Sequence, residues 1–241
     1  MMERWYIRQV QLPSLPRGSY TAELPAVRDL YRRGALSFAQ PVTFLTGENG
    51  SGKSTLLEAI ARCAGYNAEG GSKNFRFSTR EITSSLAEHL RLVRSAYEKD
   101  GFFLRAESLY NLATQVDELD LNPEGYGGRS LHAQSHGESI RSLVCSRFRG
   151  QGLYLLDEPE TGLSPTAQMA LLYEMHRLCR ADSQFIIATH SPVLLAYPGA
   201  VIYALSDEGI RETTYRESEP YRLTRQFLND PEGMLRRLLE E

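Results

Sequence analysis

The sequence predicts an α/β fold in which helices flank a mainly parallel core sheet. Three features of the 241 residues predict it. An apolar run, Val42–Thr46, passes directly into a glycine-rich turn and a helix. Two further apolar runs end in acidic residues and in a histidine, as buried parallel strands do where they present ligand-binding side chains. From Leu153 to Ile202 strand and helix patterns alternate, which is typical of a parallel sheet.

The amino-terminal region is expected to add antiparallel strands to this core. Trp5–Leu12 alternates in polarity as a strand does, and Pro13–Pro25 is rich in residues typical of loops. The unit that follows, Phe38–Ala61, contains the first motif.

Gly47–Ser54 fits the pattern G-x-x-x-x-G-K-[ST] at every fixed position. The glycines let successive N–H groups point at phosphate oxygens, and the start of the helix Ser54–Ala61 adds unpaired N–H groups and a positive dipole end. A glycine-rich turn that binds nothing is the alternative, and the strand–loop–helix context argues against it. Lys53 is expected to reach the β- and γ-phosphates, and the Ser54 hydroxyl to bind Mg²⁺. The predicted nucleotide-binding residues are Glu48, Asn49, Gly50, Ser51, Gly52, Lys53, Ser54 and Thr55.

Residues 65–129 are predicted to form an inserted, mainly helical lobe within a single domain that spans residues 1–241. Apolar residues recur at helical spacing in Thr83–Tyr97, and strand patterns are limited to Asn74–Ser78 and Phe102–Arg105. A second helical run follows Glu107. The lobe is too short for a coiled-coil arm, because a 30-residue helix spans only about 45 Å and the chain must turn back.

A second turn that suits an anion lies at Ala133–Ser139 and opens a helix, Ile140–Phe148, with apolar residues at helical spacing. One nucleotide has no obvious need for two such helix starts from the same subunit. We therefore expect this turn to address a nucleotide bound by another subunit.

The apolar run Gly152–Leu156 ends in two carboxylates, Asp157 and Glu158. If it is a buried parallel strand, both acids lie at its carboxyl end, where ligands bind. Asp157 is then expected to complete the Mg²⁺ shell, and Glu158 to polarise the attacking water as a general base. Solvated acids at a strand end are the alternative, and the phosphate loop argues against it.

A third apolar run, Phe185–Ala188, delivers Thr189 and His190. A neutral imidazole there could hydrogen-bond the γ-phosphate or hold Glu158 and its water in place. A capping or core histidine is the alternative. Lys53, Glu158 and His190 are the predicted catalytic residues. Beyond them, Ala200–Ala204 predicts another strand, and Asp230-Pro231 is expected to cap a last helix.

Composition sets limits on the class of protein. The hydrophobic fraction of 41% suffices for a core, and the net charge of −3 gives no global nucleic-acid footprint. No apolar run reaches the roughly 18 residues of a membrane-spanning helix, and the first residues lack the apolar stretch of a signal peptide. The three cysteines, Cys63, Cys145 and Cys179, lack metal-site spacing. We expect reduced thiols, a cytoplasmic location and no membrane insertion.

Taken together, these motifs resemble those of ABC-type ATPases. The phosphate loop, the Ser-x-Gly-Glu turn, LLDEPE, Gly162–Pro165 and THSP follow the order of the Walker A, signature, Walker B, D-loop and H-loop motifs. More narrowly, QSHGES, DEPETGLSP, ATHSPVLLAYPGA and FLNDPEGMLRRLL are similar to a group of small soluble bacterial ATPases of AAA or ABC-like type.

This resemblance implies an ATPase that sandwiches ATP and Mg²⁺ between two copies of the chain and switches an unknown protein partner. Ser135, Gly137 and Glu138 would contact the partner's ATP, and Ser164 would sit at the dimer seam. Binding of ATP and formation of the homodimer would then favour each other reciprocally.

Two features depart from the pattern of transporter ATPases. QSHGES replaces the usual LSGGQ, and no clear Gln loop precedes the lobe. Glu107 could fill the Gln position as a Mg²⁺ or water contact, with a solvated glutamate at a helix start as the alternative. The adenine contact is also open, and the candidates for stacking are Trp5, Tyr6, Tyr20 and Tyr31, although such aromatics more often belong to a core.

Three other functions compete with this hypothesis. A nucleotide-binding subunit of a transporter is disfavoured by those departures. A nucleic-acid ATPase in repair or defence is suggested by two groups of arginines, although helix arginines usually form a solvated face. These are Arg80, Arg91 and Arg94 in the lobe and Arg141, Arg147 and Arg149 after the signature turn. A small-molecule kinase has no use for the second anion turn.

Overall fold

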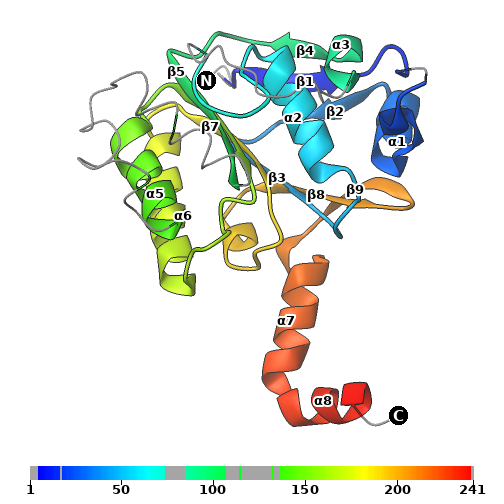
Figure 1. The fold of residues 1–241 in the computed structure, drawn as a ribbon, viewed down its shortest axis with the longest axis vertical. Helices are drawn as coiled ribbons and strands as arrows, with labels where there is room; N and C mark the ends of the chain where they lie inside the picture. The colour runs from blue at the N-terminus through cyan, green and yellow to red at the C-terminus, as the bar shows by residue number, and fades with distance from the viewer. Residues whose placement is uncertain are drawn as a thin grey trace.

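The computed structural model describes residues 5–16, 18–73, 85–106, 114, 132 and 136–239. In this part of the chain, two sheets are packed with helices around them, and a pair of helices extends away from the body (Figure 1). The predicted strand Asn74–Ser78 and the predicted helical run after Glu107 lie outside the described residues.

The larger sheet has six strands and confirms the mainly parallel core. Its order is β5 (Asp100–Arg105), β6 (Gly152–Asp157), β7 (Gln184–Ala188), β3 (Val42–Thr46), β8 (Val201–Ser206) and β9 (Gly209–Thr213). The first five strands of this order are mutually parallel, and only β9 runs antiparallel to its neighbour β8. The middle strands β3, β6 and β7 are buried along their whole length and are mostly apolar, because helices or strands cover both of their faces.

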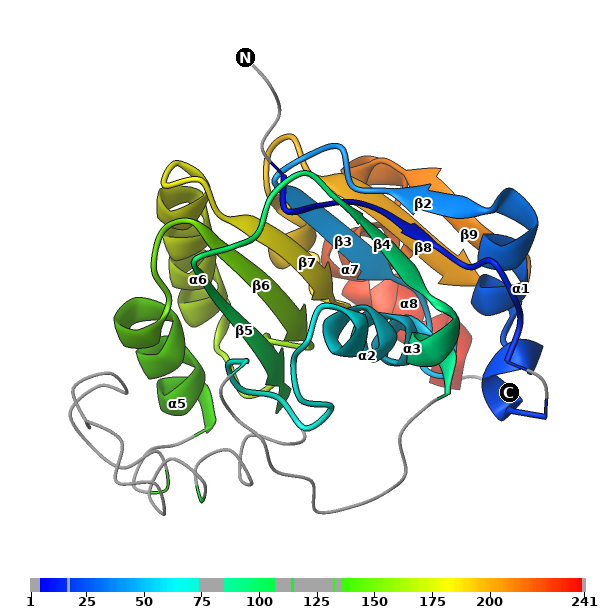
Figure 2. The same ribbon diagram turned by 90° about the horizontal axis from the view of Figure 1, so that it is seen from above.

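A smaller antiparallel sheet confirms the expected amino-terminal strands. Its order is β2 (Ala35–Ser37), β1 (Ile7–Gln11) and β4 (Arg91–Arg94). Figure 2 shows this sheet lying over the same side of the larger sheet as helix α2. The two sheets therefore enclose α2 between them.

Helices cover both faces of the larger sheet, and two more helices form an arm that leaves the body. The helices of the body are α1 (Pro25–Arg33), α2 (Lys53–Cys63), α3 (Leu86–His89), α5 (His136–Ser142) and α6 (Pro165–Cys179), and those of the arm are α7 (Glu219–Asn229) and α8 (Pro231–Leu239). Short helical turns are η1 (Tyr20–Glu23), η5 (Leu143–Arg147), which is π-helical, η6 (Leu194–Ala196) and η7 (Tyr215–Glu217).

The alternation of side chains along the strands separates the core into two halves. Leu45, Leu155 and Ile186 pack with α2 in one cluster. Phe44 and Tyr154, from the opposite sheet face, pack with α5, η5 and α6 in the other. Helices α2 and α5 therefore lie on opposite faces of the sheet, as period-two alternation requires.

Two sequence predictions of secondary structure were wrong. The predicted helix Thr83–Tyr97 is only the short α3 in the described residues, followed by β4. Val93 and Tyr97, which gave the helical spacing, are exposed, whereas Leu90 and Leu92 pack on the core at strand spacing. The second helix predicted between Leu153 and Ile202 is just the three-residue turn η6.

The predicted lobe, residues 65–129, is only partly described. Its described strands belong to the body, because β4 pairs with β1 and β5 pairs with β6. Strands β4 and β5 therefore pack as part of the body. The boundary of any lobe within the remaining residues stays a prediction.

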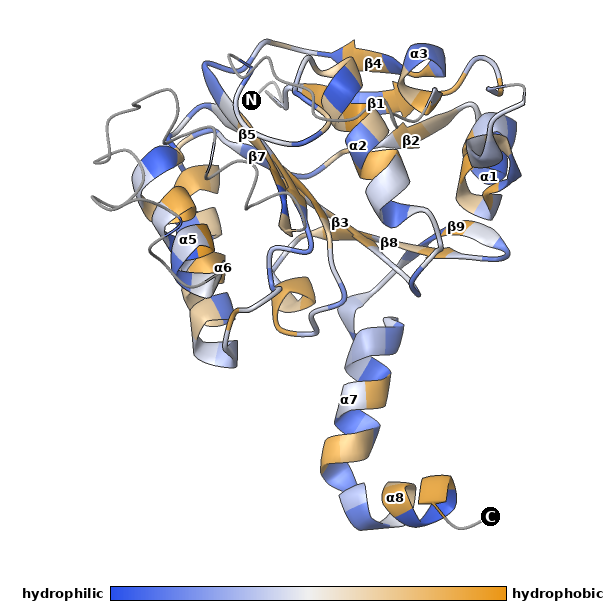
Figure 3. Cartoon of the chain, viewed as in Figure 1, coloured by the Kyte–Doolittle hydropathy of each residue, from blue (hydrophilic) through white to orange (hydrophobic). Residues whose placement is uncertain are grey.

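The C-terminal arm, Glu219–Leu239, is built differently from the body. Helices α7 and α8 contain no buried residue, and Figure 3 shows apolar bands along both of them. Asp230 Oδ1 accepts the N–H of Gly233 at 2.9 Å, which confirms the predicted cap of the last helix. Within the described residues, no helix is both long and apolar enough to cross a membrane.

Candidate nucleotide site

The phosphate loop joins the carboxyl end of β3 to the first turn of α2, as predicted. Gly47 has a φ of +143°, and a Cβ atom there would lie 2.1 Å from the carbonyl oxygen of Leu205, so only glycine fits. Lys53 is almost fully buried, and its Nζ donates to the carbonyls of Gly47 and Glu48, both at 2.8 Å. Phosphate oxygens would replace these carbonyls as acceptors when a nucleotide binds.

Lys53 is a buried cation with three carboxylates near it. Burial lowers the pKa of the ammonium group, while the carboxylates of Glu158, Asp157 and Glu160 act in the opposite direction. The hydroxyls of Ser51 and Thr46 are buried beside the loop and have no hydrogen-bond partner among the described residues. Unpaired buried donors cost free energy unless a ligand or water satisfies them.

Sheet register brings the second motif to this loop. Leu45, Ala188 and Asp157 lie in one row across β3, β7 and β6. The Ser54 hydroxyl donates to Asp157 Oδ1 at 2.9 Å, although the two residues are far apart in sequence. Parallel strands that end at one edge of the sheet explain this meeting.

This pair fits Mg²⁺. A serine hydroxyl and a carboxylate are oxygen ligands, and Mg²⁺ commonly takes only one or two protein ligands, with phosphates and water completing its octahedron. Among the described residues no group of three or more His, Cys, Asp or Glu side chains is placed to hold a metal ion. Ser54 and Asp157 are therefore suited to a metal that arrives with its nucleotide.

Glu158 and His190 face each other across β6 and β7. Glu158 Oε1 lies 3.6 Å from His190 Nε2, and this nitrogen is buried without a hydrogen-bond partner among the described residues. Glu158 has a φ of +50°, which is rare for a residue with a side chain, while its N–H donates to Ala188. Backbone strain of this kind is typical of functional sites.

Arg105 is a site residue that sequence reasoning did not single out. It ends β5 in register with Asp157, and its guanidinium is 4.0 Å from Asp157 Oδ2 and 3.1 Å from Glu58 Oε2. The predicted strand Phe102–Arg105 already placed it at the ligand edge, so the same reasoning could have found it. Glu107, the residue chosen instead, lies outside the described residues.

The signature turn and the D-loop lie against each other. A Cβ atom on Gly137 would come within 2.6 Å of the Gly162 carbonyl oxygen, so glycine is required for this contact. Glu138 is exposed, and the Ser164 hydroxyl accepts the N–H of Ala167 as the N-cap of α6. Ser135 lies outside the described residues. Helix α5, which begins at His136, packs on the sheet face opposite α2 through Ile140.

The four aromatic residues predicted as candidates for stacking on adenine lie in two different places. Trp5 Nε1 donates to the carbonyl of Ala39, and the Tyr6 hydroxyl to that of Asp182. Both acceptors precede strands β3 and β7, at the edge away from the phosphate loop. Tyr20 is 64% exposed on η1, which leads into Leu24, a residue that packs against Gly52 of the loop. Tyr31 is also exposed, on α1.

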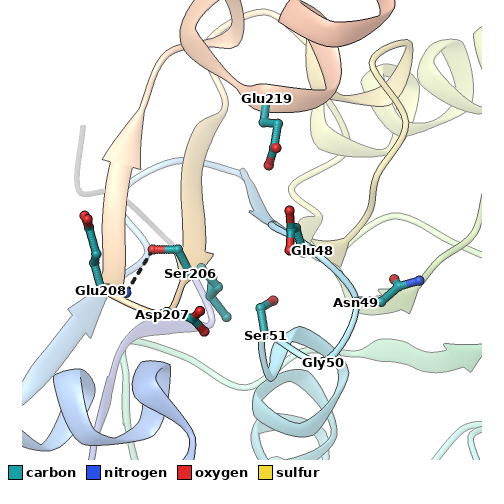
Figure 4. Close-up of a pocket in the computed structure, with 9 residues that line it drawn as sticks. Glu48, Asn49, Gly50, Ser51, Ser206, Asp207, Glu208 and Glu219 are labelled. Atoms are coloured by element: carbon teal, nitrogen blue, oxygen red, sulfur yellow. Dashed lines mark hydrogen bonds between the residues drawn. The ribbon is translucent and has the colours of Figure 1, made fainter. Parts of the chain in front are cut away.

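A cavity of about 700 Å³ adjoins the phosphate loop (Figure 4). It is lined by loop residues Glu48–Ser51, the turn Leu205–Glu208 and Glu219. Figure 4 shows carboxylates of Glu48, Asp207 and Glu219 around it. The cavity therefore has an acidic lining and includes four of the predicted nucleotide-binding residues, Glu48–Ser51.

The five described arginines among those considered for nucleic-acid binding lie in two separate regions of the fold. Arg94 pairs with Glu98 at 3.0 Å, and Arg147 pairs with Asp100 at 2.8 Å. Arg91 is exposed on β4, whereas Arg141 belongs to α5 on the opposite face of the large sheet. Arg80 lies outside the described residues.

Known protein families and individual proteins resemble this chain in sequence. A family described as "AAA domain, putative AbiEii toxin, Type IV TA system" matches residues 121–196, and one described as "AAA domain" matches residues 30–109. The vitamin B12 import ATP-binding protein BtuD of Salmonella typhimurium is 31% identical over 195 residues, which cover 71% of this chain and 76% of BtuD. The putative ABC transporter ATP-binding protein PH0132 of Pyrococcus horikoshii is 26% identical over 191 residues, or 72% of each chain.

The chain therefore belongs to the ABC-type family of ATP-binding P-loop ATPases. Among solved structures, cbiO1 from Clostridium perfringens, part of the ABC transporter complex cbiONQ, is 17% identical and aligns over 98% of this chain and 99% of its own, with a TM-score of 0.49. The assignment rests on the sequence relatives.

Proposed function

We propose that this protein hydrolyses ATP with Mg²⁺ and that two copies close around the nucleotide to switch a protein partner. The observation that carries the proposal is the convergence of Lys53, Ser54, Asp157, Glu158 and His190 at one sheet edge. Family membership supports ATP binding. ATP hydrolysis and the closure of two copies around the nucleotide are proposed beyond what family membership supports.

Each residue has a role that follows from its position. Lys53 and the loop N–H groups would hold the β- and γ-phosphates, and Ser54 and Asp157 would hold Mg²⁺, which supplies charge stabilisation for the transferred phosphoryl group. Glu158 would accept a proton from the attacking water. His190 Nε2, buried beside Glu158 without a partner among the described residues, would donate to the γ-phosphate or orient that water. Tyr20 is the aromatic best placed to stack on adenine.

The opposite placement of α2 and α5 supports a shared site. A turn that leads into α5, on the sheet face opposite α2, would be poorly placed to meet its own phosphate loop, but a second copy facing head to tail could offer it. Gly137 and Ser164 lie on neighbouring turns of one surface, as a common seam requires. In this arrangement ATP would bind at the interface of two chains.

Phosphate release from Mg-ATP tests hydrolysis directly. We expect Glu158→Gln to lower kcat by about 10²–10⁴-fold, the usual contribution of a general base, with ATP affinity unchanged. Glu174→Gln, which changes a partly exposed carboxylate on α6, is the control and should keep wild-type kcat. Equal rates in the wild type and Glu158→Gln would contradict the proposal.

The names of the relatives favour a second candidate function. BtuD is an import ATP-binding protein and PH0132 is a putative transporter ATP-binding protein, so this chain could drive a membrane-spanning partner. Purification of tagged protein from detergent-solubilised membranes distinguishes the two. A stoichiometric membrane-spanning partner would favour the transporter subunit, and recovery without one would favour the independent switch.

A further inference from the structure

Glu160 occupies an unusual place between two of the predicted motifs. It lies two residues after Glu158, and its Oε1 accepts three hydrogen bonds from the other strand end. The donors are the Thr189 hydroxyl at 2.6 Å, the His190 N–H at 2.7 Å and the Ser191 N–H at 3.1 Å. Hydrogen bonds to an ionised carboxylate are stronger than neutral ones, so this contact fixes the chain at His190 firmly.

The same contact continues to the D-loop. The Ser191 hydroxyl donates to Gln168 Oε1 at 2.6 Å and accepts the N–H groups of Val193 and Leu194. Gln168 Nε2 donates in turn to the carbonyl of Leu163 at 3.1 Å, one residue before Ser164. Glu160, Ser191 and Gln168 thus form a continuous polar brace from His190 to the D-loop.

The turn that carries Glu160 is shaped for this contact. Glu158 adopts a left-handed conformation, and its carbonyl accepts the N–H of Thr161, so the chain folds back toward β7. Thr189 is fully buried and Ser191 nearly so. Glu158 and Glu160 therefore divide their tasks: one faces the His190 ring and the other holds the His190 main chain.

We propose that Glu160 is a positioning residue that sets the distance between His190 and Glu158 and ties both to the D-loop through Gln168. It touches no reacting atom and acts through His190. The inference rests on the proposed hydrolysis for its kinetic test, and on the hydrogen bonds alone for its structural test.

The kinetic test compares Glu160→Ala with Glu160→Gln. In Glu160→Ala, loss of all three bonds should lower kcat by about 10–100-fold, the effect of misplacing a catalytic group, and leave KM for ATP within about twofold. The amide oxygen that Glu160→Gln introduces can accept the same bonds, so this variant should recover most of kcat. The matched control is Glu217→Ala, because Glu217 also accepts bonds from a threonine hydroxyl and main-chain N–H, both of Thr214.

A double-variant cycle separates positioning from general stability. If Glu160 acts only through His190, adding Glu160→Ala to His190→Ala should cost no further kcat. If the kcat losses of the two single variants multiply in the double variant, the inference is overturned. A kcat for Glu160→Ala within about twofold of the wild type would also overturn it.

Amide hydrogen exchange tests the brace without any hydrolysis. We expect Glu160→Ala to speed exchange at His190 and Ser191 by at least about tenfold, with the β3 amides unchanged. Unchanged exchange at His190 and Ser191 would overturn the inference. A wild-type protein that releases no phosphate would instead contradict the proposed function and leave this exchange result decisive for Glu160.

Discussion

Phe44 on β3 and Phe227 on α7 are the same residue in very different surroundings. Phe44 is fully buried at the centre of the large sheet, whereas Phe227 is 39% exposed on the C-terminal arm. The body buries nearly every apolar side chain of its strands, and the arm buries none of its own. Helices of about 10 residues are marginal in water without tertiary packing. The difference teaches that the candidate site is held by the closely packed core of the body. The arm, in contrast, gains little stability from packing against the rest of this chain.

The largest expected effect on the free energy of unfolding comes from a substitution in the core of the body. Phe44→Ala should lower the free energy of unfolding by about 3–5 kcal/mol, because it leaves a cavity in a closely packed core. Phe227→Ala should change it by less than about 0.5 kcal/mol, as exposed substitutions usually do. Urea denaturation of the nucleotide-free protein measures both. Similar losses for the two variants would show that the arm is packed in solution.

Nucleotide binding should add stability only through the body. With Mg-ATP at 100 times its Kd, the free energy of unfolding should rise by about 2.7 kcal/mol. Lys53→Ala should abolish this gain, since the ammonium is the positive charge inside the phosphate loop. Thermal denaturation with and without Mg-ATP measures the gain, and Arg225→Ala on the arm is the control. An undiminished gain in Lys53→Ala would place the nucleotide elsewhere.

Helix caps offer a matched pair between the two regions. Ser164 caps α6 in the body and Asp230 caps α8 in the arm. Ser164→Ala should lower the free energy of unfolding by about 1 kcal/mol. Asp230→Ala should only fray the arm, because the arm is hardly coupled to the body. Global denaturation with circular dichroism at 222 nm tests this, and an equal shift of both midpoints would refute the distinction.

The smallest effects concern the thiols. Burial raises the pKa of both the Cys145 and the Cys179 thiols, that of Cys179 to about 11, and Cys179 is only partly exposed on α6 whereas Cys145 is exposed on η5. A raised pKa leaves less thiolate at neutral pH, so Cys179 should react with iodoacetamide at least about tenfold more slowly than Cys145. Mass spectrometry of the labelled peptides gives the order. Faster labelling of Cys179 would mean that the α6 end opens readily.

The same comparison explains what the sequence could predict. The phosphate loop, Asp157, Glu158 and His190 were found because each follows its own strand within a few residues, and parallel strands end at a common edge. Strand β4 was missed because its partner β1 is about 80 residues away, and such pairing outweighs local helical spacing. Local patterns determine motifs, but long-range pairing decides ambiguous segments.

Glu160 and Arg105 show which site residues could not be predicted from the local sequence. Glu160 lies inside the quoted DEPETGLSP, yet nothing local distinguishes it from a solvated acid. Its role depends on Thr189 and Ser191 arriving from the next strand. Arg105 likewise gains meaning only from its register with Asp157. The signature turn stays a prediction, because its proposed ligand is held by another copy.

The central claim is that ATP is bound by two chains together. The most direct measurement is the solution mass of Glu158→Gln by light scattering, with and without Mg-ATP, because loss of the general base should trap the closed state. The account predicts a monomer without nucleotide and twice that mass with Mg-ATP, and a return to monomer when Lys53→Ala is added. A mass that ATP leaves unchanged, with ATP binding confirmed separately, would contradict it.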